Sequence, residues 1–138
     1  LSLNQIDDIS EIALKMEIDA IVATNTTLDR HGIKSRVKNE KGGLSGKPLF
    51  SKSTWVLAHL SQRLDNKIPL IGVGGVASAT DAYQKLLAGA TVVQLYTGLV
   101  YHGIGLVSEI NKGLSEILSN QGIDHVSKVV GKESDNFL

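Results

Sequence analysis

The chain has 138 residues, 42% of them hydrophobic, and its 14 basic side chains balance 14 acidic ones, so the formal net charge is zero. This length and composition predict one globular domain, and the balanced charge argues against a nucleic-acid partner. With no cysteine in the sequence, disulfides, thiolate metal sites and a thiol nucleophile are excluded.

The beginning of the sequence indicates a soluble segment of a longer chain. Residues 1–10 (LSLNQIDDIS) lack the basic and apolar regions of a signal peptide, and no apolar run is long enough to span a bilayer. We therefore expect this segment by itself to be soluble and cytoplasmic. The chain starts without a methionine and directly at a helix cap, which favours the interior of a longer protein.

The first predicted elements are a helix and a strand. Ser2 and Gln5 have the spacing of a capping box, and apolar residues then recur on one helical face until about Glu17. Residues 19–23 (DAIVA) are mostly apolar without alternation, which predicts a strand buried on both faces. Polar residues 24–27 (TNTT) follow this strand, where parallel barrels present their chemistry.

A long connection follows, because residues 28–52 show no periodicity and contain several glycines. Connections of this length in compact domains are usually functional or disordered. Its basic side chains have two interpretations, attraction of an anionic substrate or a solvated, mobile surface, and we favour the second. These side chains are Arg30, His31, Lys34, Arg36, Lys38 and Lys41. Ser51 or Ser53 is then expected to cap a helix that runs to Leu64.

The stretch 69–105 organises the rest of the chain. An apolar run, 70–73, ends at Gly74-Gly75, and after a predicted helix a second run, 91–95, ends at Tyr96-Thr97-Gly98. Two strands about thirty residues apart suit a βαβ unit, whose strands are parallel. Both glycine turns therefore belong at the same end of the sheet.

Glycine turns at two neighbouring strand ends suit an anion, and phosphate above all, because their N–H groups are free. In (β/α)8 barrels a phosphate site is frequently built from the last two such loops and a short extra helix, for which residues 99–102 leave room. From the residues alone, ordinary tight turns explain the glycines equally well. For Asn25 and Thr26, roles in capping or turns are the simpler explanation at this point.

The predicted fold is α/β, the C-terminal part of a (β/α)8 TIM barrel with about three parallel strands. Residues 1–131 form this incomplete barrel, including a last helix from Gly105 to Gly122, and residues 132–138 are expected to be a flexible tail. Three strands cannot close a barrel. The two open sheet edges suggest association with the missing half-barrel or self-association.

Four motifs resemble class 2 dihydroorotate dehydrogenases, the quinone-linked flavoenzymes of pyrimidine (UMP) biosynthesis. In chain order they are ATNTTLDR (23–30), GGLSGKPL (42–49), IGVGGVAS (71–78) and VQLYTGLVYHG (93–103). The resemblance implies an FMN-dependent barrel that oxidises dihydroorotate to orotate. It also implies that the complete protein is peripherally membrane-associated and passes electrons to quinone through an N-terminal region absent from this sequence.

The resemblance further implies roles for individual residues. Asn25 and Thr26 would bind the pyrimidine substrate. The FMN-binding set would be Thr24, Gly46, Gly74, Gly75, Tyr96, Thr97 and Gly98. No metal site is expected, because the four histidines are scattered without ligand spacing. No catalytic residue is expected here either, because the family's serine base and a flavin-contacting lysine precede this segment, which should be inactive alone. The alternatives are a half-barrel that only binds FMN or phosphate, and another FMN or sugar-phosphate barrel enzyme.

Overall fold

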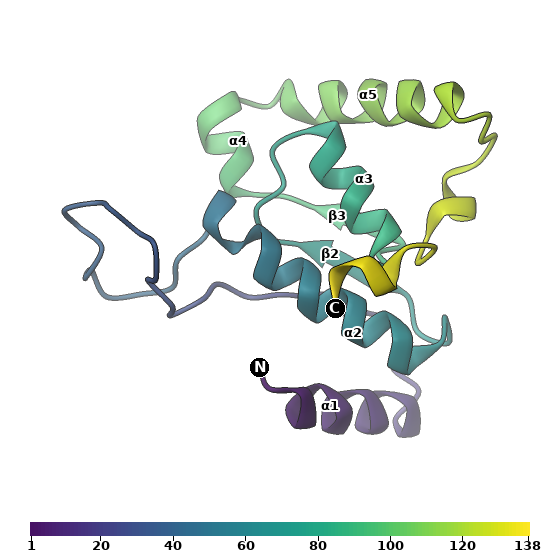
Figure 1. Ribbon diagram of the computed structural model, residues 1–138, viewed down its shortest axis with the longest axis horizontal. Helices are drawn as coiled ribbons and strands as arrows, with labels where there is room; N and C mark the ends of the chain where they lie inside the picture. Colours follow the sequence, from purple (N-terminus) through teal and green to yellow (C-terminus); the bar gives the residue numbers. More distant parts are fainter.

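A three-stranded parallel sheet lies at the centre of the computed structural model, which describes all 138 residues (Figure 1). The strands β1 (Ile21–Ala23), β2 (Leu70–Val73) and β3 (Val92–Gln94) are adjacent in chain order. Parallel pairing of consecutive strands requires a crossover between each pair, and helices supply both crossovers. The predicted α/β fold with three parallel strands in an open sheet, as part of a TIM barrel, is confirmed.

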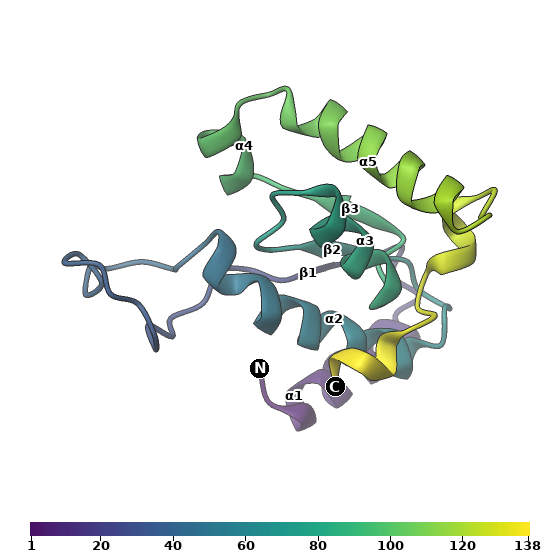
Figure 2. The ribbon, with the colours of Figure 1, turned by 45° about the horizontal axis from the view of Figure 1, so that its top comes forward.

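Five α-helices and three 3-10 turns accompany the sheet. They are α1 (Leu3–Lys15), η1 (Lys47–Leu49), α2 (Phe50–Leu64), α3 (Ala79–Leu87), α4 (Thr97–His102), α5 (Leu106–Asn120), η2 (Val126–Val129) and η3 (Ser134–Phe137). Helices α2 and α3 pack on the sheet, α1 packs on α2, and α5 packs on α3 (Figures 1 and 2). None of these helices is long and apolar enough to cross a membrane.

The two faces of the sheet differ in exposure. Ala23, Leu70 and Gly72 are buried, whereas Val22 and Val92 are 54% and 52% exposed. Both valines align with Ile71 of the central strand, and residues in register share a face. The expectation of a first strand buried on both faces is therefore wrong for this chain, because three strands leave the second face without a covering layer.

The helix starts show which capping signals were decisive. Ser2 and Gln5 make both hydrogen bonds of the predicted capping box. Helix α2, however, is not capped by Ser51 or Ser53: it begins at Phe50, directly after η1. The Pro-containing turn η1 leads the chain into the helix, and Ser53 is instead buried.

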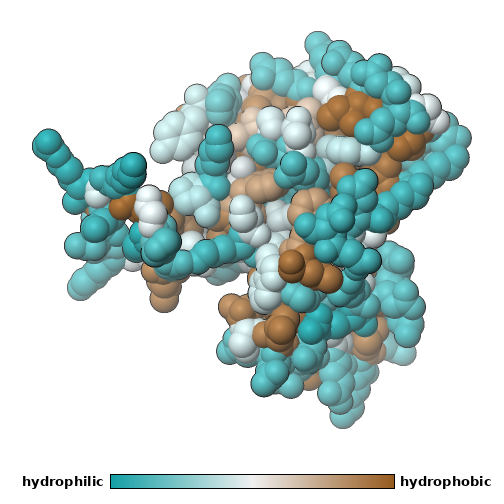
Figure 3. Space-filling view, viewed as in Figure 1, coloured by the Kyte–Doolittle hydropathy of each residue, from teal (hydrophilic) through white to brown (hydrophobic).

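The long connection after β1 extends away from the body of the molecule (Figures 1 and 2) and is mostly hydrophilic on its surface (Figure 3). Within this connection, the Arg30 guanidinium group donates to the carbonyl oxygens of Thr27, Lys38 and Gly42, at 2.9, 3.1 and 2.6 Å. Arg30 thus joins the two arms of the loop. The mobility expected for this surface stays a prediction.

The C-terminal segment returns to the core. Turn η3 contacts α2, and Phe137 packs against buried side chains of the main hydrophobic cluster. This packing places residues 134–137 on the body of the molecule. The boundary at residue 131 and the flexibility expected beyond it stay predictions.

Candidate functional site

A cavity of about 990 Å³ lies at the carboxyl ends of all three strands. The loops that follow β1, β2 and β3 line it, together with the end of the long connection. It brings together every residue for which the sequence predicts a site role: Thr24, Asn25, Thr26, Gly46, Gly74, Gly75, Tyr96, Thr97 and Gly98. Their placement in one cavity is observed, and their individual roles stay predictions.

The turn after β2 can be formed only by glycine. Gly74 and Gly75 have φ angles of +116° and +78°, a region that side chains disfavour. A Cβ atom on Gly75 would lie 2.6 Å from the Cβ and 2.7 Å from the backbone nitrogen of Phe50. The turn is therefore packed directly against the first residue of α2.

The turn after β3 touches the turn after β2. A Cβ atom on Gly98 would lie 2.7 Å from the carbonyl oxygen of Val76. The Thr97 hydroxyl donates to the Ser45 hydroxyl at 3.0 Å, which brings the end of the long connection to the same place. Gly46, beside Ser45, has φ +78°, and a Cβ there would lie 3.1 Å from the Thr97 methyl group. Three loops therefore meet around Thr97.

Backbone donors on these two turns are free. The N–H groups of Gly75, Val76, Tyr96 and Thr97 donate to no backbone or side-chain acceptor. Unpaired N–H groups in glycine-containing turns are the donors that backbone anion sites use. The residues that line the cavity include Lys47 and His102 but no acidic side chain. The cavity is therefore suited to a negatively charged ligand.

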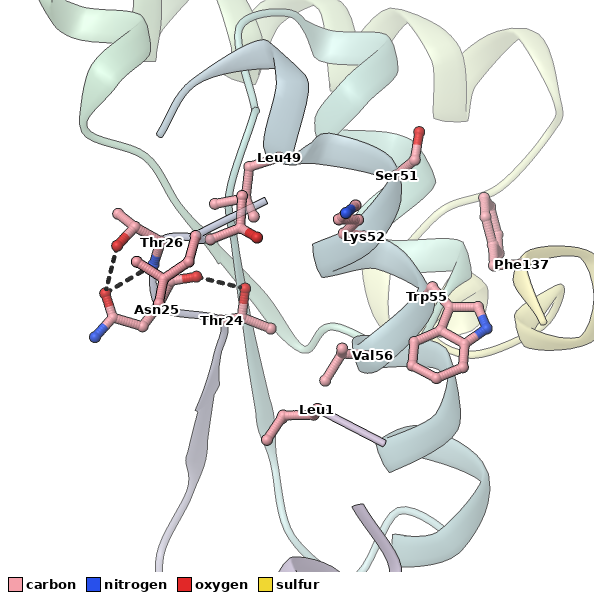
Figure 4. Close-up of a pocket in the computed structure, with 12 residues that line it drawn as sticks. Leu1, Thr24, Asn25, Thr26, Leu49, Ser51, Lys52, Trp55, Val56 and Phe137 are labelled. Carbon is pink, nitrogen blue, oxygen red and sulfur yellow. Dashed lines mark hydrogen bonds between the residues drawn. The ribbon is translucent and has the colours of Figure 1, made fainter. Parts of the chain in front are cut away.

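The segment after β1 supplies a fixed side-chain amide. The Thr24 hydroxyl donates to the Asn25 carbonyl at 2.9 Å, and the Asn25 side-chain oxygen accepts from the Thr26 N–H at 2.7 Å (Figure 4). The Asn25 amide nitrogen points away from Thr24 and Thr26 (Figure 4). The Asn25 side chain is held in place through its oxygen, so its amide nitrogen can donate a hydrogen bond to a ligand.

A second cavity, of about 870 Å³, adjoins this segment on the β1 side (Figure 4). Thr24, Asn25 and Thr26 line both cavities, and α2 residues such as Trp55 line the opposite wall of the second. The three polar residues after β1 thus separate two hollows. No group of three or more His, Cys, Asp or Glu side chains is close enough to hold a metal ion.

A buried lysine, not predicted from the sequence, lies behind the glycine turn. Lys85 of α3 has no exposed surface, and its amino group donates to the hydroxyls of Ser53 and Thr54. Burial lowers the Lys85 pKa to about 7, and the nearby Asp81 carboxylate partly opposes this effect. The sequence contains a signal for this burial, because Lys85 follows Ala82 by three residues and therefore lies on the same inner face of the helix.

One other side chain has a shifted pKa. Burial and the neighbouring Arg63 lower the pKa of His59, and Asp7 partly opposes them. His59 packs edge-on against Trp55, with ring centroids 4.3 Å apart. It lies outside the larger cavity, beside Arg63, whose ion pair with Asp7 joins α2 to α1.

Comparison with known proteins finds similar sequences along the whole chain. The family model described as dihydroorotate dehydrogenase matches residues 1–118. A protein named dihydroorotate dehydrogenase (quinone) from Cereibacter sphaeroides is 53% identical over 100% of this chain and 39% of its own length. A protein of the same name from Brucella ovis is 45% identical over 99% of this chain and 38% of its own length.

Solved structures agree in fold. The crystal structure of ligand-free DHODH from Eimeria tenella superposes with a TM-score of 0.93 at 33% identity, over 96% of this chain and 37% of that one. The structure of DHODH from the same organism in complex with ferulenol has a TM-score of 0.91 at 33% identity, over 95% of this chain and 35% of that one. The chain thus spans about two fifths of the length of the curated relatives it matches.

Proposed function

Because this chain belongs to the dihydroorotate dehydrogenase family, with quinone-type relatives, we propose that it forms the FMN-binding part of an enzyme that oxidises dihydroorotate to orotate. The electron acceptor would be quinone, and the reaction would serve pyrimidine (UMP) biosynthesis. One observation supports this most: Gly75 and Thr97, whose N–H groups have no acceptor within the chain, line one cavity at the ends of adjacent strands. A phosphate group needs such a cluster of donors.

The residues around the cavity fit FMN. Gly74, Gly75 and Gly98 line the cavity, and the absence of their Cβ atoms lets these turns pack closely against Ser53, Phe50 and Val76. Thr97 adds a hydroxyl to the lining. We assign these residues, with Tyr96 and Gly46, to the phosphate and ribityl end, and Thr24 to the flavin itself. When bound, FMN supplies the acceptor for the hydride that leaves dihydroorotate.

The substrate would lie beside the segment after β1. The pyrimidine ring of dihydroorotate carries amide-like C=O and N–H groups, and Asn25 offers a matching side-chain amide. The hydrogen bonds from Thr26 to the Asn25 oxygen orient that amide before a substrate arrives. We therefore assign Asn25 and Thr26 to substrate binding and orientation.

The rest of the barrel would complete the enzyme. Val22 and Val92 are half exposed on the uncovered face of the sheet, which supports covering by the missing half-barrel or by a second copy. We assign the acid–base chemistry, the quinone site and peripheral membrane attachment to the N-terminal part of the complete protein. By itself, this segment would be soluble and inactive.

Titration of the purified chain with flavins tests the FMN proposal. Riboflavin lacks the phosphate, so FMN should bind at least about tenfold more tightly, as judged by quenching of flavin fluorescence. Thr97→Val should weaken FMN binding, whereas Thr91→Val, which alters a threonine outside the cavity lining, should not. Equal affinities for FMN and riboflavin would contradict the anion site.

Orotate binding to the FMN-loaded chain tests the substrate assignment. Asn25→Asp keeps the shape of the side chain but replaces an amide donor by a negative charge, so orotate affinity should fall by about tenfold or more. FMN affinity of this variant should stay unchanged. If FMN binds but orotate does not bind the parent chain, the alternative of a half-barrel that binds only the cofactor is favoured.

A further inference from the structure

The environment of Lys85 is unusual for a packing residue. Its amino nitrogen lies 2.7 Å from the Ser53 hydroxyl, 2.8 Å from the Thr54 hydroxyl and 3.5 Å from the Phe50 carbonyl oxygen. The same nitrogen lies 4.8 Å from the centre of the Phe50 ring. None of the three ion pairs in the structure includes Lys85. All four contacts are made to the first turn of α2.

The Ser53 hydroxyl extends this network to the glycine turn. It accepts from Lys85 and has one hydrogen, which lies within reach of the carbonyl oxygens of Phe50 (3.0 Å) and Gly74 (3.1 Å). The Phe50 oxygen already accepts from the Thr54 hydroxyl at 2.7 Å and from Lys85. The Gly74 carbonyl oxygen accepts no other side-chain donor, so the Ser53 hydroxyl is the side chain that links Lys85 to this turn.

A connected chain of donors thus runs from α3, through α2, to the turn after β2. Gly74 and Gly75 hold left-handed backbone angles, and Gly75 is in contact with the backbone of Phe50. The turn lies against Phe50 and Ser53, and a hydrogen bond to its carbonyl group adds a directional contact to this packing.

Packing by itself does not account for a lysine at this position. The neighbouring inner-face residues Ala82 and Leu86 are apolar and buried. A buried amino group without a carboxylate partner is costly, whether it keeps its charge or gives up its proton, and an apolar side chain of similar length would fill the same space without that cost. The contacts of Lys85 therefore point to a role that needs hydrogen-bond donors.

We propose that Lys85 is a positioning residue, which fixes the Gly74-Gly75 turn of the anion site through the Ser53 hydroxyl. The proposal rests on the proposed function only in assigning this turn to the phosphate of FMN. Lys85 itself lies behind the turn and is not among the residues that line the cavity. Its effect on a ligand is therefore indirect.

Three variants separate positioning from general stabilisation. Lys85→Met removes the donors and keeps the length of the side chain. Ser53→Ala removes the link to Gly74 while leaving Lys85 in place. Thr54→Val is the matched control, because it removes another hydrogen-bond partner of Lys85 that does not contact Gly74.

The order of the turn can be measured by ¹⁵N relaxation on the purified chain without ligand. In the parent chain and in Thr54→Val, the order parameters of Gly74 and Gly75 should be those of a rigid backbone, about 0.85. In Lys85→Met and in Ser53→Ala they should fall, and the double variant should resemble either single variant. Unchanged order parameters in Lys85→Met and Ser53→Ala, or an equal loss in Thr54→Val, would overturn the proposal.

FMN titration of the same proteins distinguishes this proposal from the proposed function. If the parent chain binds FMN, Lys85→Met and Ser53→Ala should each weaken binding by about tenfold, and Thr54→Val by much less. Equal weakening in all three variants would indicate general destabilisation and would also overturn positioning. If no protein binds FMN but the order parameters change as expected, positioning by Lys85 stands and the FMN assignment fails.

Discussion

The stability of the parent chain should increase with alkaline pH, and replacing Lys85 by methionine should remove that increase. The Lys85 pKa is lowered from 10.5 to about 7 in the folded chain because the amino group is buried. Between these values the unfolded chain binds a proton at Lys85 that the folded chain does not. The free energy of unfolding therefore rises with pH through this window.

The magnitude follows from the two pKa values. Each pKa unit corresponds to about 1.4 kcal/mol, so the penalty for keeping Lys85 buried is about 4 kcal/mol at pH 7 and about 1 kcal/mol at pH 9.5. The contribution to the free energy of unfolding thus rises by about 3 kcal/mol over this range. Such a change is a large fraction of the total stability of a small domain.

Urea denaturation followed by far-ultraviolet circular dichroism, at intervals from pH 7 to pH 9.5, measures this rise. The unfolding free energy of the parent minus that of Lys85→Met should rise by about 3 kcal/mol between pH 7 and pH 9.5. Lys112→Met, at an exposed position on α5, is the control and should follow the parent. A difference that stays constant with pH would refute the assignment of a buried, largely neutral amine to Lys85.

Two further predictions concern glycines in close contacts. Gly75→Ala should lower the free energy of unfolding by about 2–5 kcal/mol, from its positive φ and its collision with Phe50. In the same urea denaturation, Gly32→Ala should lower the free energy of unfolding by only about 1–2 kcal/mol, because that glycine has a similar φ but open space around it. Gly113→Ala should destabilise the chain by up to about 2 kcal/mol although alanine favours helix, since its Cβ would lie 2.5 Å from that of Ala79. Ala79→Gly in the same chain should relieve the collision, and a double variant no more stable than Gly113→Ala alone would contradict this.

Local sequence signals predicted much of the fold correctly. The Ser2–Gln5 capping box, the glycine stop after α3 and the short helix α4 all formed where their residues indicated. Each depends on residues within about one helical turn, so the physical cause is contained in the local sequence. The start of α2 was missed because a turn around Pro48 replaced a serine cap that the residue type alone would favour.

The site divides in the same way. Glycines after consecutive parallel strands predicted a common cavity, since parallel strands place their carboxyl ends together. The Lys85 network was not predictable from its separate segments, because Ser53 and Lys85 are 32 residues apart and their contact arises when α2 and α3 pack side by side. The organising role of Arg30 in the long loop was missed for a similar reason.

The sequence by itself determined the alternation of strands and helices, the positions that only glycine can occupy, and the polar groups that follow each strand. These depend on backbone sterics and on hydrogen bonds between near neighbours. Only the tertiary structure decided which of those groups meet around Thr97, which face of the sheet stays open, and why a lysine is buried behind the glycine turn. Such features depend on the packing of elements distant in the chain, and packing fixes distances that residue spacing does not contain.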